Sequence, residues 1–293
     1  MAVQVEVHSD PALAGLGRSL ASRIERSWVM IHERLGLPVR EARLTLELVR
    51  DAETLRKRVG ERSGGHIESW AVGVALPFSD WLGLRQDPGM PYDLESLRRV
   101  LDHELVHVAL AGLGEPGYER LPRWMHEGLA QWCSGEAYFG EVLDLWVASR
   151  MEQLLPLRDL EDRFPIESSA ASLAYQESAS FVSFLANRAD GRTISRFLGR
   201  IRQGESFEEA FVAAFGGSRV TLEEEWKSVV RKDASLLLRF LRENFFFVIL
   251  ALLSPLLLVG LVRRGRRKRQ LLRQWEQERS ETEMEIQDLA EER

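Results

Sequence analysis

The spacing of hydrophobic positions changes along the chain. The first third has both helix-like and strand-like spacing, and the longer remainder has helix-like spacing. Apolar residues recur at spacings of three and four between Leu16 and Ile31, which predicts a helix within residues 1–36. A short helix is expected from Asp51, a predicted N-cap, to Gly60. Three further segments have the pattern of strands: 43–49, 69–76 and 80–85. The first third is therefore expected to combine helices with a small sheet.

A long helical stripe begins after Asp93, which is a plausible N-cap. Its members are all aliphatic and lie three or four positions apart: Leu94, Leu97, Leu101, Leu105 and Val108. Gly112 or Gly114 is expected to end this helix, and Pro122 to open the next one. Later helices are predicted at 141–155, 171–189, 192–203, 205–215 and 221–243.

The run FFFVILALLSPLLLVGLV, at 245–262, carries no charge and is near the shortest length that spans a bilayer core. A buried core helix is the alternative, but a soluble core rarely needs a helix that is apolar on every face. The run therefore predicts one transmembrane helix. The chain then has four parts: a folded domain at 1–232, a juxtamembrane segment at 233–244, the span at 245–262 and a basic-then-acidic tail at 263–293.

The basic run RRGRRKR at 263–269 predicts a cytoplasmic tail, which would place the domain at 1–232 on the extracytoplasmic side. Basic residues before the span moderate this bias. The first 17 residues lack the basic and apolar regions of a signal peptide. Either a leader precedes Met1 or the domain stays in the cytoplasm. We expect the former, because the chain starts close to the first predicted helix.

Composition narrows the chemistry that the domain can perform. A net charge of −6 argues against general nucleic-acid binding. Hydrophobic residues make up 45% of the chain, enough for a sizeable core. The single cysteine, Cys133, excludes an intrachain disulfide and a cysteine-rich metal site. Any metal ion must therefore be held by histidine, aspartate or glutamate.

The stretch LDHELVHVAL, at 101–110, places His103, Glu104 and His107 on one predicted helix. Residues four apart share a helix face, so both imidazoles can reach one tetrahedral zinc ion. Glu104, beside the first histidine, is placed to take a proton from a metal-bound water. The pattern alone is weak, because a helical histidine pair can simply face solvent. Here, however, the rest of the helix is apolar.

A catalytic zinc ion needs a third protein ligand and one open coordination position. Glu127 lies 24 positions after His103, on the next predicted helix. Gly128 would let these two helices approach closely. A surface carboxylate is the alternative, but the neighbours of Glu127 are large and apolar, which favours a ligand: Trp124, Met125, Leu129 and Trp132.

The sequence HELVH followed by W-x-x-E-G-x-A resembles the gluzincin zinc metallopeptidases, most closely their peptidase MA-like domains. The resemblance covers about 40–232. It implies an α+β, zincin-like fold with a small N-terminal sheet, an active-site helix and a mostly helical C-terminal half. It also implies that His103, His107 and Glu127 bind zinc and that Glu104 is the general base and acid.

Further residues are expected to complete such a site. Related zincins stabilise the oxyanion with a tyrosine from a later helix, which points to Tyr175; a packed aromatic is the alternative, and His126 is a competing donor. Family members often have an acidic residue where this chain has Gln131, whose amide oxygen could still accept a hydrogen bond from His103. The strand ending at 76, with Gly73, is either a sheet edge that pairs with a peptide or a buried strand.

The remaining candidates are expected to have structural roles. His8 and His32 are predicted to be surface or packing residues, and His66 to be exposed in a loop. Trp124 and Trp132 are expected to brace the helix pair. Cys133 is predicted to be a small buried hydrophobe.

Together these observations predict a membrane-anchored zinc metallopeptidase that hydrolyses peptide bonds with a zinc-bound water activated by Glu104. The alternative is a membrane-tethered zinc-binding scaffold with little or no turnover. The expected partners are a peptide or protein substrate and the membrane, through 245–262, and no nucleic acid. The oligomeric state stays open at this point.

Overall fold

The computed structural model describes residues 3–65, 67–89, 92–135, 142–165, 168–188 and 191–232, and a few separate positions beyond 244. The chain divides into two compact units, Met1–Asp233 and Ala234–Arg293. No helix among the described residues is long and apolar enough to cross a membrane. The predicted segments at 233–244, 245–262 and 263–293 lie wholly or largely outside the described residues, as does His66.

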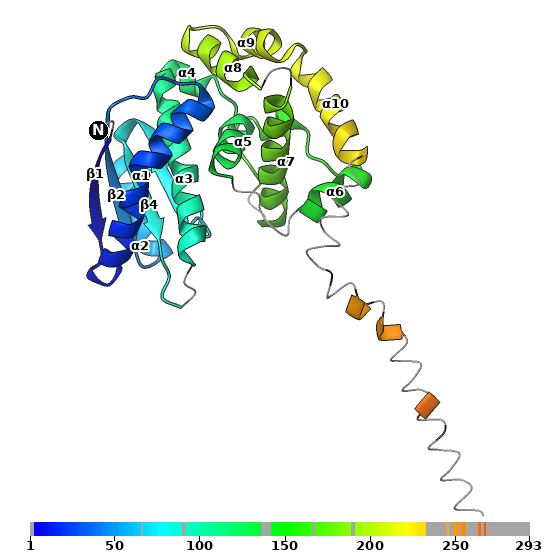
Figure 1. Cartoon of the computed structure of the whole chain (residues 1–293), viewed down its shortest axis with the longest axis horizontal. Helices are drawn as coiled ribbons and strands as arrows, with labels where there is room; N and C mark the ends of the chain where they lie inside the picture. Colours follow the sequence, from blue (N-terminus) through cyan, green and yellow to red (C-terminus); the bar gives the residue numbers. More distant parts are fainter. Residues whose placement is uncertain are drawn as a thin grey trace, which may run out of the picture. The chain divides into compact units, whose positions relative to one another are not determined.

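A four-stranded sheet in the order β1-β2-β4-β3 forms one end of the first unit (Figure 1). The strands β1 (Val3–Ser9), β2 (Ala42–Val49) and β4 (Trp81–Arg85) run parallel, and β3 (Gly73–Leu76) pairs antiparallel with β4. Because β3 ends this order, it is an edge strand. The segment is thus an edge strand rather than a buried one, and its pairing with a peptide stays a prediction.

Part of the backbone of β3 is directed outward, away from β4. The amide of Arg85 donates to the carbonyl oxygen of Val72 at 2.9 Å, so these two residues form a hydrogen-bonded pair. Bonded and non-bonded pairs alternate along an antiparallel ladder. The register of β3 on β4 therefore turns the N–H and C=O groups of Gly73 and Ala75 away from β4.

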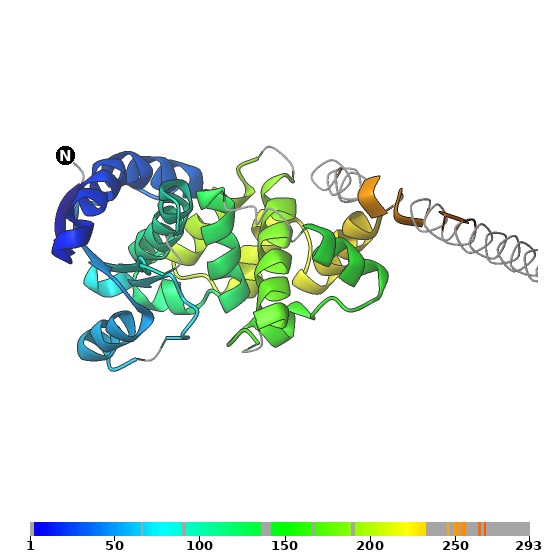
Figure 2. The ribbon, with the colours of Figure 1, turned by 90° about the horizontal axis from the view of Figure 1, so that it is seen from below.

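Helices cover both faces of the sheet. Figure 2 shows α1 (Ala14–Leu35) and α3 (Leu94–Leu110) on one face and α2 (Ala52–Ser63) on the other. The helix α2 closes a small core made by Val49, Leu55, Val59 and Trp81. All five residues of β4 are buried, as expected for a parallel strand that is covered on both faces.

One strand was not predicted, and two bounds were predicted wrongly: the strand expected at 69–76 begins only at Gly73, and one helix ends later than expected. The strand β1 was not expected, although VQVEVHS alternates, because its stability comes from pairing with β2 some forty residues later. The helix α2 does not stop at Gly60 but continues to Ser63. Gly64 ends it with a φ of 67°, a left-handed conformation that glycine adopts without strain. The predicted N-cap is confirmed, since the Asp51 carboxylate accepts from the Thr54 amide at 2.7 Å.

The rest of the unit is helical, as predicted. The helices are α4 (Glu115–Glu119), α5 (Arg123–Ser134), α6 (Val142–Arg150), α7 (Ser168–Ala186), α8 (Thr193–Arg202), α9 (Phe207–Phe215) and α10 (Arg219–Lys232). Most bounds agree with the expected helices to within three residues. The short α4 was not predicted, α6 ends five residues before the expected 155, and the predicted end of the last helix lies outside the described residues. The predicted α+β fold class, with a small sheet and a mostly helical body, is therefore confirmed.

The close approach at Gly128 involves a different helix from the one predicted. A Cβ atom added there would lie 2.5 Å from the backbone oxygen of Ser178 and 2.6 Å from Cγ2 of Val182, both on α7. The helix α5 packs against both α3 and α7, and Gly128 makes room on the side that faces α7. Trp124 supports the same contact, because its fully buried ring lies 5.4 Å from the ring of Phe181.

Candidate active site

The helix α3 presents the predicted motif because its caps and its apolar stripe fix its rotation. The carboxylate of Asp93 accepts from the Ser96 amide at 2.9 Å and so begins the helix. The aliphatic positions pack into the core: Leu97, Leu101, Leu105 and Val108. His103 and His107 consequently lie one turn apart on the face that meets α5.

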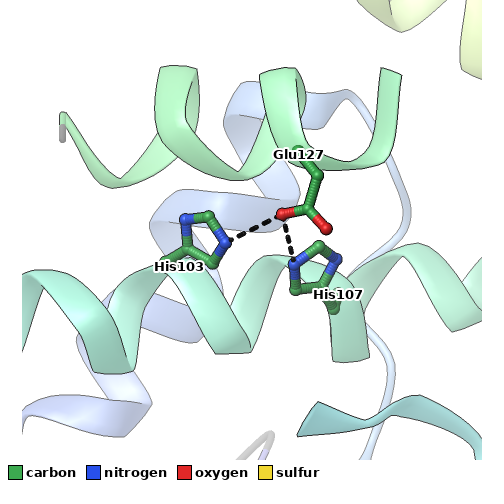
Figure 3. A group of neighbouring side chains, drawn as sticks. All are labelled: His103, His107 and Glu127. Atoms are coloured by element: carbon green, nitrogen blue, oxygen red, sulfur yellow. Dashed lines mark ion pairs between the residues drawn. The ribbon is translucent and has the colours of Figure 1, made fainter. Parts of the chain in front are cut away.

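Three potential ligands meet where α3 and α5 lie side by side (Figure 3). The Nε2 atom of His103 lies 3.3 Å from Oε2 of Glu127, and the Nε2 atom of His107 lies 3.6 Å from the same oxygen. One donor atom from each of these three residues lies within 4.8 Å of the others. Two imidazoles and one carboxylate at this spacing fit the ligand set of a catalytic zinc ion with an open position.

The electrostatics of Glu127 favour its role as a charged ligand. Burial by itself would raise the pKa of this carboxyl group. Hydrogen bonds from His103 and His107 outweigh that effect and hold the pKa well below its usual range. Glu127 is therefore ionised at neutral pH despite an exposed fraction of only 9%, and it carries the charge that a divalent cation would neutralise.

Glu104 lies between the histidine pair and the edge strand. It is buried, and a Cβ atom added to Gly73 would lie 2.9 Å from its Oε1 atom and 2.5 Å from Cγ1 of Val100. The missing side chain of Gly73 thus makes room for the side chains of α3.

The candidate residues border one cleft of about 670 Å³. Its lining comes from β3 and the segments on either side of it, from α3, from the short α4, from α5 and from α7. Tyr175 on α7 belongs to this lining together with His103, His107, Glu104 and Glu127. All five residues singled out for the site from the sequence are therefore brought together around one space.

Tyr175 is held in an aromatic cluster at the side of the cleft. Its ring lies 4.8 Å from that of Phe164 and 6.4 Å from that of Trp70. Burial and the negative charge of Glu127 raise the pKa of its hydroxyl group. The hydroxyl is consequently protonated at neutral pH and can donate a hydrogen bond into the cleft.

His126, the competing donor, does not belong to the described lining of the cleft. Its Nε2 atom lies 3.1 Å from the backbone oxygen of Tyr118. Burial and the neighbouring His107 lower the pKa of His126 to about 4. His126 is therefore a neutral packing residue behind the ligands.

The hydrogen bond expected from Gln131 is absent. This side chain is buried, and neither its oxygen nor its nitrogen has a hydrogen-bonding partner within the described part of the chain. Gln131 therefore does not orient His103 in the way that the sequence suggested.

Tyr118 and Arg123 also line the cleft and were not predicted from the sequence as site residues. Burial and the charges of Glu127 and Glu104 raise the pKa of the Tyr118 hydroxyl. Tyr118 comes from the short helix α4, which carries no periodic pattern that could have revealed it. Arg123 had a signal, because it lies four positions before Glu127 on α5 and must share its face.

The other predicted structural roles agree with the fold. His8 is exposed and lies 2.9 Å from a carboxylate oxygen of Glu6. His32 is a packing residue, with Nδ1 2.8 Å from the backbone oxygen of Trp28. Cys133 is buried and unpaired, as predicted for a small hydrophobe, and burial raises its thiol pKa to about 12.

A family model matches the part of the chain that forms this cleft. The model of the peptidase MA superfamily matches residues 65–232, from the loop before β3 to the end of α10. The match includes every residue that lines the cleft and leaves out β1, α1, β2 and α2. No curated protein matches the sequence. Because the match covers more than half of the chain, the chain belongs to the peptidase MA superfamily.

Proposed function

We propose that this protein is a membrane-anchored zinc metallopeptidase. The observation that carries the proposal is the convergence of His103, His107 and Glu127 within 4.8 Å, beside Glu104 in a cleft. Membership of the peptidase MA superfamily supports hydrolysis of peptide bonds in general. The edge strand β3, which borders the same cleft, supports a peptide as the substrate.

In this proposal, His103, His107 and Glu127 hold the metal ion. Zinc, when bound, supplies a Lewis acid that acidifies water and polarises the scissile carbonyl group. Glu104 accepts the proton of the attacking water and delivers it to the amine of the leaving product. Its side chain is buried beside Gly73 and borders the same cleft as the three ligands.

Tyr175 donates a hydrogen bond to the carbonyl oxygen of the substrate as that oxygen gains charge. The raised pKa of its hydroxyl keeps the donor proton in place. The substrate backbone pairs with the outward N–H and C=O groups of Gly73 and Ala75, which adds a strand to the sheet edge. An extended peptide is thereby laid across the face of the site.

The membrane anchor rests on the sequence alone. The uncharged run at 245–262 is long enough to span a bilayer, and the basic run at 263–269 favours a cytoplasmic tail. The peptidase domain would then face the extracytoplasmic side. Reporter fusions at both ends of a chain expressed with its upstream sequence test this orientation, and a cytoplasmic signal at both ends would refute it.

The catalytic proposal is tested by the variant Glu104→Gln, with Glu33→Gln on the exposed surface of α1 as the matched control. We expect the purified chain to bind one zinc ion and to cleave members of a broad peptide library. Glu104→Gln should keep the zinc and lose turnover by about 10²–10⁴-fold, the usual contribution of a general base. Zinc binding without any turnover in the unmodified chain would favour the scaffold function, and no zinc binding would refute both.

A further inference from the structure

The two carboxylate oxygens of Glu127 have different partners. Oε2 faces the Nε2 atoms of His103 and His107, at 3.3 and 3.6 Å. Oε1 instead lies 3.5 Å from a guanidinium nitrogen of Arg123. Arg123 is the first residue of α5 and sits one turn before Glu127, so the helix itself brings the two side chains together.

Arg123 is fixed by contacts beyond this ion pair. Its guanidinium group lies over the ring of Phe164, with 5.4 Å to the ring centre, and forms a hydrogen bond with the hydroxyl of Tyr175. Its backbone amide donates to the carbonyl oxygen of Glu161 at 2.7 Å. A side chain held at several points loses little further freedom when it orients a neighbour, and the planar guanidinium group directs its donors in fixed directions.

This arrangement differs from an ordinary ion pair on a helix surface. The side chain of Glu127 is 11% exposed, whereas that of Arg123 is 46% exposed and borders the cleft. A buried carboxylate that is held on one oxygen can present only its other oxygen to the histidine pair. The carboxylate is thereby set to bind a metal ion through a single oxygen.

We propose that Arg123 is a positioning residue that orients the Glu127 carboxylate for metal binding and couples this ligand to Tyr175. The inference rests on the proposed function, because it requires a metal ion at Glu127. It assigns to this arginine the supporting role that Gln131 does not perform. Outer partners of metal ligands typically change metal affinity by about 10–100-fold when they are removed.

The test compares the zinc affinity of the whole chain and its variants by competition with a chromogenic chelator, without any substrate. Arg123→Met keeps the aliphatic stem and removes the charge and the donors. Arg158→Met is the matched control, because Arg158 is 75% exposed and pairs with Asp159. We expect Arg123→Met to bind zinc about tenfold more weakly or worse, the control to be unchanged, and Arg123→Lys to regain part of the loss.

Thermal unfolding of the metal-free proteins separates positioning from support of the fold. We expect Arg123→Met and the control to unfold at the same temperature without zinc. The inference is overturned if Arg123→Met binds zinc as tightly as the unmodified chain, or if its affinity falls only in step with a loss of metal-free stability. If the unmodified chain itself binds no zinc, the proposed function fails, and that result is distinct from a failure of Arg123 alone.

Discussion

Gly73→Ala tests whether the space beside the edge strand serves Glu104. The added Cβ atom would lie 2.5 Å from Cγ1 of Val100, 2.9 Å from Oε1 of Glu104 and 3.0 Å from its Cγ. Carbon atoms in comfortable contact are about 3.5–4.0 Å apart, so the neighbours must retreat by roughly 1 Å. Overpacking of this size costs about 1–3 kcal/mol of unfolding free energy. Since the end of Glu104 can swing away, we expect a cost near the lower limit.

The functional cost should be larger, because the group that moves is the proposed base. A displacement of about 1 Å in a catalytic group can reduce the rate by roughly 100-fold. We therefore expect turnover to fall about 100-fold in Gly73→Ala. Zinc affinity should stay unchanged, since none of the three ligands is among the nearest neighbours of the added atom.

The measurements are urea unfolding, zinc competition and peptide hydrolysis on the same preparations. Gly199→Ala is the control, because its added Cβ atom meets nothing within 4 Å and α8 should gain up to about 1 kcal/mol from the better helix former. Val100→Ala in the Gly73→Ala background removes the shortest contact and leaves the contact with Glu104. Full turnover in Gly73→Ala would refute the reasoning, and full recovery in the double variant would assign the effect to Val100 instead.

Three further outcomes follow from other contacts. Gly128→Ala should lower the unfolding free energy by about 3 kcal/mol in urea titrations, because the obstacle is the backbone oxygen of Ser178, which cannot rotate away; an unchanged midpoint would contradict the close packing of α5 on α7. Burial raises the pKa of Glu177 to about 8 from an ordinary 4.5, so the folded chain holds a proton that the unfolded chain releases. Stability should therefore fall as pH rises from about 4.5 to 8, by up to about 1.4 kcal/mol per pH unit, and Glu177→Gln should remove this slope in unfolding measured across that range. Tyr175→Phe should keep its zinc affinity, and its turnover in peptide hydrolysis should fall by about 10²–10³-fold. A larger fall in Tyr118→Phe would show that Tyr118, and not Tyr175, is the oxyanion donor.

The local features of the fold were readable from the sequence because their causes lie within a few residues. The cap at Asp93 acts on the amide of Ser96 three positions later. The pairing of His103 with His107 follows from the helical repeat alone. Helix bounds were predicted for the same reason, while Gly60 was mistaken for a helix end because a glycine inside α2 looks the same as one that terminates it.

Contacts between distant segments were less predictable. The strand β1 depends on β2, which is supplied only after the long helix α1. The close approach at Gly128 was recognised, but its partner on α7 was not. Tyr118 lines the cleft from a short helix that has no hydrophobic pattern. The hydrogen bond expected from Gln131 depends on the exact distance between side chains of two helices, which the sequence does not give.

The types of the candidate ligands, their spacing and the helix face shared by the two histidines could be predicted from the sequence alone, since the helical repeat and the chemistry of imidazole and carboxylate are properties of short segments. Three features become visible only in the folded chain: β3 is an edge strand, Glu104 lies against Gly73, and Arg123 lies 3.5 Å from the second carboxylate oxygen of Glu127. These features depend on how segments pack across the cleft. Packing is set by the sum of many weak contacts between residues that are far apart in the chain, and no single stretch of sequence contains them.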